Sequence, residues 1–410
     1  MAVEIIATGS ELVLGEQVDT NSAHIARRLR EIGLAVNYKT IVGDDEPRLV
    51  EAIRIALSRA DVIIISGGLG PTLDDVTRPA VAKAVGRELV FRPDLLGQIE
   101  ARFRAYGRPM GDNNRRQAYV PDGAQPIPNP VGTAPAFIVE HQGRIIASLP
   151  GVPREMEYLL EQAVLPYLKT KLGPGRVILV RTLHTVGQGE SRLDALIADL
   201  QVSANPAFGL SAKSGQVDVR MTATADDHAA ARRMLADMEV KVRERIGKWI
   251  FGADDDTLES VIAQLLLDQR HTLATVEMNT GGLISSRLAG DKAVTGEVYV
   301  GGVVLSDAHA LGRALGVEVQ AEQADQAATA ARAAQRIRAI HSATLGLAVA
   351  VAASGDGGGM KMHAALAHAS GIEAAERSFG GHPGLAPQFA SALALGLTWK
   401  YLKQLSHPPA

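Results

Sequence analysis

Residues 62–77 read Val-Ile-Ile-Ile-Ser-Gly-Gly-Leu-Gly-Pro-Thr-Leu-Asp-Asp-Val-Thr, and this stretch decides the fold of the N-terminal part of the chain. The unbroken apolar run Val62–Ile65 is typical of a strand that is buried on both faces of a parallel sheet. The glycines that follow it let the backbone take positive φ and approach a ligand closely. The stretch therefore predicts a strand, a glycine-rich turn and then a helix capped by Thr77.

The sequence before this stretch alternates strand and helix patterns. Val3–Ala7 and Val36–Val42 are apolar enough to be strands, and the segment between them has helical spacing. Thr20 and Asn21 are predicted to cap that helix, and Gly33 to end it. The next predicted helix places Leu49, Ile53, Leu57 and Ala60 on one face. This βαβαβα order predicts an α/β fold with right-handed crossovers.

Two punctuated segments divide the rest of the chain. Gly173–Gly175 and Phe251–Asp256 are predicted linkers. They separate residues 1–170, 176–252 and 257–405, in line with about 150 residues per domain. The middle part has the pattern of a small α+β unit. The last part has strand patterns at 273–276, 298–304 and 345–352 with helices between them, and is predicted to be α/β.

Composition excludes several classes of protein. The 410 residues carry a net charge of -3 and no cysteine. The chain therefore has no disulfide, no thiolate metal site and no cysteine nucleophile. Because no half is strongly basic, we predict no direct nucleic-acid binding. The start of the chain does not resemble a signal peptide, and no apolar run approaches the about 20 residues of a membrane helix. We therefore expect a cytoplasmic protein without a membrane segment.

Loops rich in glycine and acidic residues follow three predicted strands. Ser10 and Glu11 follow the first strand, Asp44 and Asp45 the second, and the glycine segment the third. In an open parallel sheet such loops meet at the carboxyl ends of the strands, where ligands bind. The loop amides and the following helix start are suited to a phosphate.

The acidic pair Asp74-Asp75 follows the glycine segment directly. Both carboxylates would repel a phosphate unless a cation such as Mg²⁺ bridged them. The competing interpretation is a tight turn with a solvated acidic pair. With the neighbouring strand-end loops taken into account, a ligand site is the better interpretation.

Three further segments each allow two interpretations, a ligand contact or a purely structural role. Residues 129–135 and 150–155 are Gly- and Pro-punctuated turns that either contact a ligand or simply end strands. Residues 113–117 either place an arginine on a phosphate or begin a solvated helix. The eleven histidines show no metal-binding spacing, and the chain contains no nucleophile elbow, Walker A or HExxH motif.

Taken in order, these motifs resemble the competence/damage-inducible protein A (CinA) family. The resemblance covers nearly the whole chain and is carried by Thr8–Leu12, Gly15-Glu16, Asp19–Asn21, Val42–Asp45, Ser66–Thr72, Asp74–Arg78, Asn129–Pro135 and Leu149–Pro153. The N-terminal part is similar to the molybdopterin-binding fold of MoaB and MogA. The family implies a three-layer α/β domain at 1–170, a KH-like connector at 176–252 and an α/β CinA domain at 257–405. Family members are thought to form dimers, so a homodimer is expected.

The resemblance also implies an activity for the N-terminal domain: hydrolysis of the pyrophosphate of ADP-ribose or a related nucleotide with a divalent metal. Mg, Mn or Co is the expected metal, with K as a further candidate ion. Asp74, Asp75 and Asp44 would be catalytic, and Asp75 and Asp44 would hold the metal. The nucleotide would contact Thr8, Gly9, Ser10, Glu11, Asp19, Asn21, Gly67, Gly68, Leu69, Gly70, Thr72, Asn129, Gly132, Thr133, Pro150 and Gly151. The alternatives are a nucleotide- or molybdopterin-binding protein without catalysis, and a nicotinamide-nucleotide deamidase.

The C-terminal part departs from the family's deamidase pattern. Where active members carry Glu-Ser-Cys-Thr-Gly-Gly, with serine as the presumed nucleophile, residues 277–282 read Glu-Met-Asn-Thr-Gly-Gly. Methionine cannot attack an amide. Leu305 stands where the family has a tyrosine, and the lysine of the same element is absent. The degenerate site would comprise Met278, Asn279, Thr280, Gly281, Gly282 and Leu305. We expect this domain to fold but not to deamidate.

Overall fold

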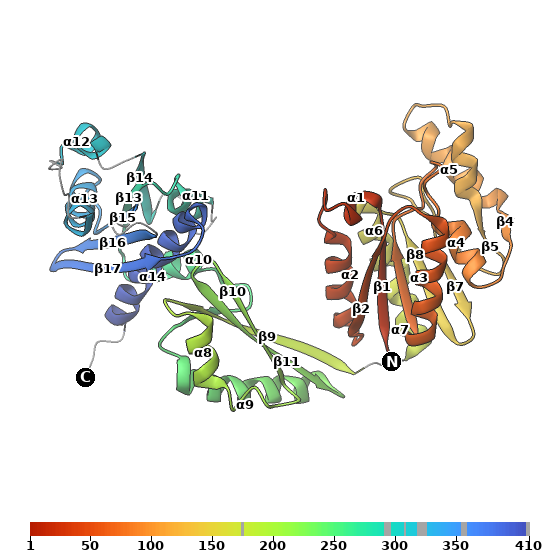
Figure 1. The fold of residues 1–410 in the computed structure, drawn as a ribbon, viewed down its shortest axis with the longest axis horizontal. Helices are drawn as coiled ribbons and strands as arrows, with labels where there is room; N and C mark the ends of the chain where they lie inside the picture. Colours follow the sequence, from red (N-terminus) through yellow and green to blue (C-terminus); the bar gives the residue numbers. More distant parts are fainter. Residues whose placement is uncertain (174–175, 291–296, 307–308, 318–325, 354–358, 407–410) are drawn as a thin grey trace. The chain divides into compact units, whose positions relative to one another are not determined.

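The computed structural model describes residues 1–173, 176–290, 297–306, 309–317, 326–353 and 359–406 (Figure 1). Residue contacts group the chain into two compact units, Met1–Leu179 with Thr224–Arg232, and Val180–Ala223 with Arg233–Ala410. Parts of two stretches used above lie outside the described residues: 174–175 of the first linker and 307–308 of the element that begins at Leu305. No helix in the described ranges is both long and apolar enough to cross a membrane.

The first unit is built on a six-stranded sheet. Its strands run in the order β2-β1-β3-β8-β7-β6; the first four are parallel, and β7 is antiparallel to β8 and β6. They are β1 (Val3–Thr8), β2 (Val36–Val42), β3 (Val62–Ser66), β6 (Gln125–Ile127), β7 (Ala136–His141) and β8 (Arg144–Leu149). The remaining elements are α1 (Ser10–Val13), α2 (Thr20–Glu31), α3 (Glu46–Arg59), α4 (Thr77–Ala84), β4 (Leu89–Phe91), α5 (Pro93–Ala105), η1 (Asp112–Ala118), β5 (Tyr119–Pro121), α6 (Pro153–Leu159), η2 (Leu160–Val164) and α7 (Leu165–Leu172).

Both faces of this sheet are covered by helices. Alternate strand residues point to opposite faces. Ile5 and Ile64 belong to a core with residues of α2, α6, η2 and α7. Ile6 and Ile63 belong to a second core with residues of α3, α4 and α5. All four isoleucines are fully buried, each stabilising the fold by about 1.5–3 kcal/mol. The predicted three-layer α/β architecture is confirmed.

Two predicted helix caps are wrong. Asp19, not Thr20 or Asn21, caps α2, because its carboxylate accepts the backbone N–H of Ser22. The N-cap of α4 is Val76, and Thr77 is the first helical residue. Its hydroxyl instead donates to the carbonyl of Gly67 at 2.8 Å. In both helices a residue that the pattern assigns to capping is instead hydrogen-bonded at the end of β3. In α4 this is Thr77, with Gly67, and in α2 it is Asn21, with Ser66.

The second unit combines the connector with the C-terminal domain. The connector sheet has the order β10-β11-β9-β12 and consists of β9 (Val177–Val186), β10 (Ala207–Lys213), β11 (Gln216–Ala225) and β12 (Ile250–Ala253), with α8 (Glu190–Ile197) and α9 (His228–Ile246). The C-terminal sheet has the order β14-β13-β15-β16-β17. Its strands are β13 (Leu273–Met278), β14 (Tyr299–Leu305), β15 (Leu345–Ala353), β16 (Met360–His368) and β17 (Gly371–Phe379).

Helices cover both faces of the C-terminal sheet as well. They are α10 (Leu258–Asp268), α11 (Leu283–Gly290), α12 (His309–Leu315), α13 (Gln326–Ile340), η4 (Pro383–Leu385) and α14 (Ala386–Ser406). Residues of α10, α11 and α14 pack with Leu345 and Leu347 on one face, whereas α12 and α13 pack with Val276 and Ala348 on the other. The predicted α/β class is confirmed for this domain.

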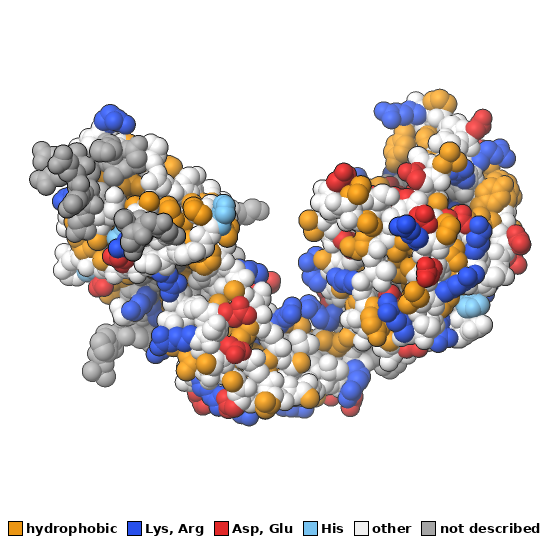
Figure 2. Space-filling view, in the orientation of Figure 1, with side chains coloured by type: hydrophobic (Ala, Val, Ile, Leu, Met, Phe, Trp, Pro, Cys, Tyr) orange, Lys and Arg blue, Asp and Glu red, His pale blue; other side chains and the backbone are white. Residues whose placement is uncertain are grey.

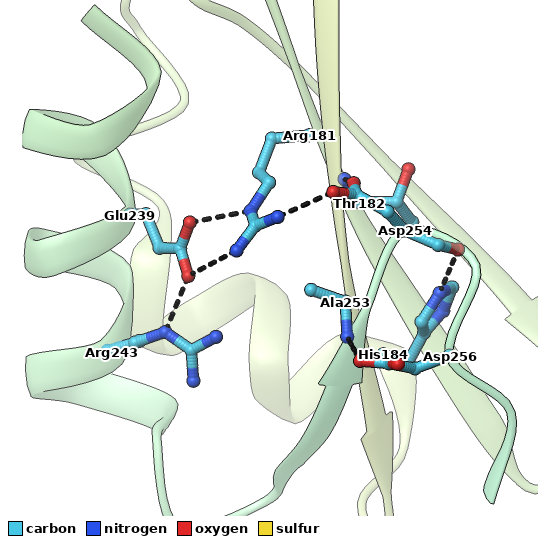
Figure 3. Close-up of polar contacts among 8 residues, drawn as sticks. All are labelled: Arg181, Thr182, His184, Glu239, Arg243, Ala253, Asp254 and Asp256. Carbon is cyan, nitrogen blue, oxygen red and sulfur yellow. Dashed lines mark hydrogen bonds and ion pairs between the residues drawn. The ribbon is translucent and has the colours of Figure 1, made fainter. Parts of the chain in front are cut away.

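The predicted linker Phe251–Asp256 is partly a strand and partly a fixed turn. Its first residues form β12, and the turn after β12 is held to β9 and α9 (Figure 3). Asp254 accepts the N–H of Thr182 at 3.0 Å and the guanidinium of Arg181, which also donates to Glu239 on α9. The acidic run therefore fixes the turn and does not form a free hinge, because each of its outer aspartates accepts a backbone N–H.

His184 joins the same network through the carbonyl oxygen of Asp254, which lies 2.9 Å from one ring nitrogen (Figure 3). The other ring nitrogen lies 2.6 Å from an Asp218 carboxylate oxygen, so the ring stands between two acceptors. Only the protonated ring can donate to both. The hydrogen bond to Asp218 accordingly raises the pKa of His184 above 6.5.

A His184→Asn variant is expected to lose thermal stability most at low pH. A raised pKa means that the charged ring contributes fully below about pH 6.5 and loses its contribution as pH rises through the folded-state value. The gap in Tm between the wild type and the variant should shrink between pH 6 and 9. Asp218→Asn should abolish that pH dependence, and a constant gap would contradict the assignment.

Candidate functional site

The candidate site lies at the carboxyl ends of β1, β3 and β8. The chain leaves β1 toward β2 on one side and continues from β3 on the other, so the strand order reverses beside β1. Such a reversal opens a crevice for ligands. The loops from the three strands meet there: the Gly67 N–H donates to Leu149, and the Asn21 amide donates to Ser66 and to Gly151.

The glycine turn after β3 has no room for side chains. Gly67 and Gly68 have φ values of 109° and 65°. A Cβ at Gly67 would lie 2.5 Å from the Thr8 carbonyl oxygen, and one at Gly68 would lie 2.3 Å from the Thr77 hydroxyl. Within the described residues, the N–H groups of Gly68 and Leu69 donate to no acceptor. Two consecutive free amides in such a turn are suited to an anion.

The acidic pair divides into an inner and an outer carboxylate. Asp75 accepts the N–H of Gly70 at 2.7 Å and the N–H of Thr72 at 2.8 Å, so it holds the loop closed. Asp74 is exposed, and a hydrogen bond from Thr72 lowers its pKa. Of the two, Asp74 therefore has the carboxylate that is open to a cation.

A buried arginine beneath the loop was missed by sequence reasoning as a site residue. Arg78 is 3% exposed and donates to the Leu69 carbonyl at 2.9 Å, while its Nε has no partner within the described residues. Burial lowers its pKa to about 10, which leaves the guanidinium charged at neutral pH. Its place in the first turn of α4, three residues after Asp75, gives no sign of this burial in the sequence. The charge lies directly behind the carbonyls of the glycine loop.

Arg116, from the segment 113–117, reaches the same loop. Its guanidinium donates to the Thr72 carbonyl at 2.6 Å. The neighbouring Gln117 is buried and donates to the Leu69 carbonyl at 3.3 Å. The segment therefore contacts the glycine loop, and the helix start there is not simply solvated.

A small cavity of about 110 Å³ opens beside the end of β1, and Thr8, Glu11, Asp19, Asn21 and Gly151 line it. Glu11 folds over Gly9, where a Cβ would lie 2.6 Å from its carboxylate. The Thr8 hydroxyl is buried and has no hydrogen-bond partner within the described residues. The ligand set predicted for the first strand end is thus brought together with that of β8.

Ser10 and Asp44 form a reciprocal pair between α1 and the end of β2. The Ser10 N–H donates to the Asp44 carboxylate at 2.8 Å, and the Asp44 N–H donates to the Ser10 hydroxyl at 3.1 Å. Asp44 therefore positions the loop after β1. Among the described residues, no hydrogen bond joins it to Asp75, its predicted partner in a metal site.

The 129–133 turn forms a separate cluster around Glu155. The Asn129 amide donates to Glu155 at 2.6 Å, and its carbonyl oxygen accepts the Gly132 N–H at 2.9 Å. Burial raises the pKa of Glu155, and the Asn129 hydrogen bond offsets part of that rise. Gly132 leaves the space that this carboxylate fills. Thr133 is half-buried next to it, and Pro150 is buried at the end of β8.

The described residues contain no preformed cluster of three or more His, Asp or Glu side chains arranged for a metal. Mg²⁺ is commonly held by one or two carboxylates together with substrate phosphates. Asp74 is an exposed carboxylate beside a loop that is suited to a phosphate, so it fits this arrangement. On the face shown in Figure 2, basic and acidic side chains are interspersed on both units.

The degenerate deamidase residues gather at the carboxyl ends of β13 and β14. Met278 pairs with Leu305 in the sheet register, and both are buried in one apolar core. Asn279 has a φ of 59° and donates to the Val351 carbonyl. The Thr280 hydroxyl donates to the buried Glu277. Gly281 and Gly282 continue the turn at positive φ. The place of the family nucleophile is therefore filled by a packed thioether.

Comparison with known proteins assigns all three parts of the chain. Residues 4–170 match the model described as "Probable molybdopterin binding domain", 180–252 the CinA KH domain, and 255–378 the CinA C-terminal domain. A protein of Acetivibrio thermocellus from the competence-damage inducible group is 36% identical over 99% of this chain and 100% of its own length. A CinA-like protein of Frankia casuarinae is 39% identical over 85% of this chain and 83% of its own.

Solved structures are also similar to part of the chain. CinA from Thermoplasma acidophilum is 37% identical and covers 40% of this chain and 96% of its own, with a TM-score of 0.38. MoaB from Thermus thermophilus is 23% identical and covers 42% and 98%, with a TM-score of 0.30. On the strength of the full-length relatives and the three domain models, the chain belongs to the CinA family.

Proposed function

We propose that the N-terminal domain binds a phosphorylated nucleotide on the glycine loop at residues 67–70 and hydrolyses its pyrophosphate bond, with ADP-ribose or a close relative as substrate. The observation that carries the proposal is the loop itself, which offers two free amides above the buried charge of Arg78. Donors fixed before the reaction stabilise charge that develops on a phosphoryl group.

Each residue around the glycine loop would have its own role in the reaction. Gly68 and Leu69 would donate to phosphate oxygens, and Arg78 would add positive charge from below. Asp75 and Arg116 would hold the loop in shape. A divalent metal (Mg, Mn or Co) at Asp74 would supply a Lewis acid and lower the pKa of a bound water. Asp44 would position the loop after β1 through Ser10, which differs from the metal-ligand role first predicted for it.

A second candidate is molybdopterin binding, which the domain model for residues 4–170 favours. Both ligands carry phosphate, so the glycine loop serves either one. Purified protein should be screened with Mg, Mn and Co against ADP-ribose, NAD, FAD and nicotinamide mononucleotide, with product identification. Release of AMP and ribose 5-phosphate supports hydrolysis. Tight binding of molybdopterin without turnover of any nucleotide would overturn the hydrolysis proposal.

Asp74→Asn is expected to lower catalysis, whereas Asp75→Asn is expected to lower nucleotide binding and stability. Asp74→Asn should lower kcat by about 100-fold, because losing a metal-facing charge costs a few kcal/mol of transition-state stabilisation. It should leave the Tm unchanged, because Asp74 is exposed. Asp75→Asn should weaken nucleotide binding and lower the Tm, because the loop amides lose an acceptor.

Steady-state kinetics and thermal unfolding check both variants. Asp122→Asn removes the same charge from an exposed position elsewhere in the unit and should change neither quantity. If Asp74→Asn turned over like the wild type, Asp74 would have no part in the reaction.

A further inference from the structure

A cavity in the second unit is lined by residues of neither site described above. Its volume is about 490 Å³, within the range of small-molecule sites. The ends of β9 and α9, the turn between β10 and β11, strand β17 and helix α14 enclose it. None of the degenerate deamidase residues lines it.

Aromatic rings form much of the wall. Both tryptophans of the chain, Trp249 and Trp399, line the cavity together with Phe389 and Tyr401. Three of these rings pack against a further aromatic ring. The ring centroids of Trp399 and Phe251 lie 6.4 Å apart. Those of Phe389 and Phe379 lie 4.7 Å apart, and those of Tyr401 and His368 lie 4.5 Å apart. The rings are therefore fixed before any ligand enters, which suits a planar aromatic group.

The charged groups at the cavity are mostly positive. Lys248, Arg377 and Lys400 line it, against the single carboxylate of Glu373. Arg377 donates to the Gly187 carbonyl at 2.8 Å, and Lys248 lies 4.3 Å from the Trp249 ring centroid. Lys400 is exposed and pairs with no carboxylate of the described residues. This charge balance favours a ligand with a negative group.

The cavity walls are locked together by close packing. A Cβ at Gly215 would lie 2.9 Å from the Ala392 side chain, and one at Gly396 would lie 2.9 Å from the Val186 side chain. The connector turn and the end of β9 thus rest directly on α14. The cavity is therefore a fixed feature of this unit, and residues of both the connector and the C-terminal domain line it.

We propose that this cavity is a binding site for a small aromatic anion, a flat ring that carries a phosphate or carboxylate. The ring stacks among the indole and phenyl groups, and the acid group meets Lys248 and Lys400. Binding here contacts the connector and the C-terminal domain at once. It is independent of the N-terminal site, which lies in the other unit.

Tryptophan fluorescence can report on this cavity, because Trp249 and Trp399 are the only tryptophans in the sequence. Full-length protein should show saturable quenching of tryptophan fluorescence with AMP, and with benzoate if a carboxylate is preferred. Adenosine lacks the charge and ribose 5-phosphate lacks the ring, so each should bind at least about tenfold more weakly than AMP, one tenfold step being 1.4 kcal/mol. Calorimetry with the same probes gives the affinities.

Matched variants separate this site from the N-terminal one. The double variant Lys248→Ala, Lys400→Ala should weaken AMP binding at least about tenfold, each step of that size being 1.4 kcal/mol, without changing adenosine binding. Lys241→Ala, on the exposed face of α9, is the charge control. Ala374→Tyr fills the cavity from the exposed strand β17 and should abolish binding. Gly67→Ala disables the N-terminal loop and should leave the fluorescence response intact.

Two outcomes would overturn the proposal. One is that neither AMP nor benzoate gives a saturable change, or that adenosine binds as tightly as AMP. The other is that sedimentation shows a dimer that Ala374→Tyr dissociates, in which case a second copy of the chain covers this face.

Discussion

A Gly67→Ala variant is expected to bind ADP-ribose about 100-fold more weakly than the wild type, since overpacking and a strained φ together cost about 2–4 kcal/mol. The new Cβ would lie 2.5 Å from the Thr8 carbonyl oxygen, a backbone atom that cannot rotate away. The φ of 109° is also unfavourable for alanine. The loop must therefore move, and the free amides of Gly68 and Leu69 move with it.

Gly143→Ala is the matched control, because Gly143 has a φ of 78° but nothing within 4 Å of its added Cβ. It lies before β8, at the end of the sheet opposite to the site. It should lose stability from the strained φ alone and keep full affinity for the nucleotide. Calorimetric titration and thermal unfolding of both variants separate the two effects. Equal affinity of Gly67→Ala and the wild type would remove the loop from the site.

The architecture around this loop follows closely from the sequence. A continuous apolar run such as Val62–Ile65 has few alternatives to a doubly covered parallel strand. Because parallel strands place their carboxyl ends at one edge, the sequence predicts that the loops after β1, β2 and β3 meet. The hydrogen bonds between Ser10 and Asp44 agree with this for β1 and β2. The contacts of Gly67 with Leu149 and of Asn21 with Gly151 add the loop after β8, whose parallel place beside β3 the sequence pattern does not specify.

The division of roles inside the site does not follow from the sequence. Asp74 and Asp75 are adjacent and identical in chemistry, yet one faces solvent and the other accepts loop amides. Only the turn geometry decides between them. Arg78 looks like an ordinary charged helix residue, and its burial depends on the carbonyls that the glycine loop turns toward it.

The fixed structure of the linker segment Phe251–Asp256 is hidden from the sequence for a similar reason. Gly and Asp at 252–256 have the composition of a flexible segment, and the same residues are good at accepting backbone N–H groups in a tight turn. The partners that fix the turn, Arg181 and Thr182, lie about 70 residues earlier in the chain. Local composition cannot distinguish a free aspartate from one with distant partners.

A Met278→Ser variant is expected to lose about 2–5 kcal/mol of stability and to gain no deamidase activity. Met278 is 1% exposed, in a core with Val276, Leu305 and Leu311. Serine there leaves a cavity and buries a hydroxyl, whose desolvation adds a further cost of about 1–3 kcal/mol if it finds no partner. Unfolding in urea, followed by the fluorescence of Trp249 and Trp399, reports on this unit directly.

Met278→Leu conserves volume and should cost less than about 1.5 kcal/mol, so it separates packing from polarity. Ammonia release from nicotinamide mononucleotide should stay at background for the wild type and both variants. The register explains why one substitution is not enough. Position 278 pairs with Leu305, so the groups that would flank a nucleophile there are apolar as well. A nucleophile without a base to accept its proton stays a weak one. Ammonia release by Met278→Ser well above background would show instead that the site kept its catalytic partners elsewhere.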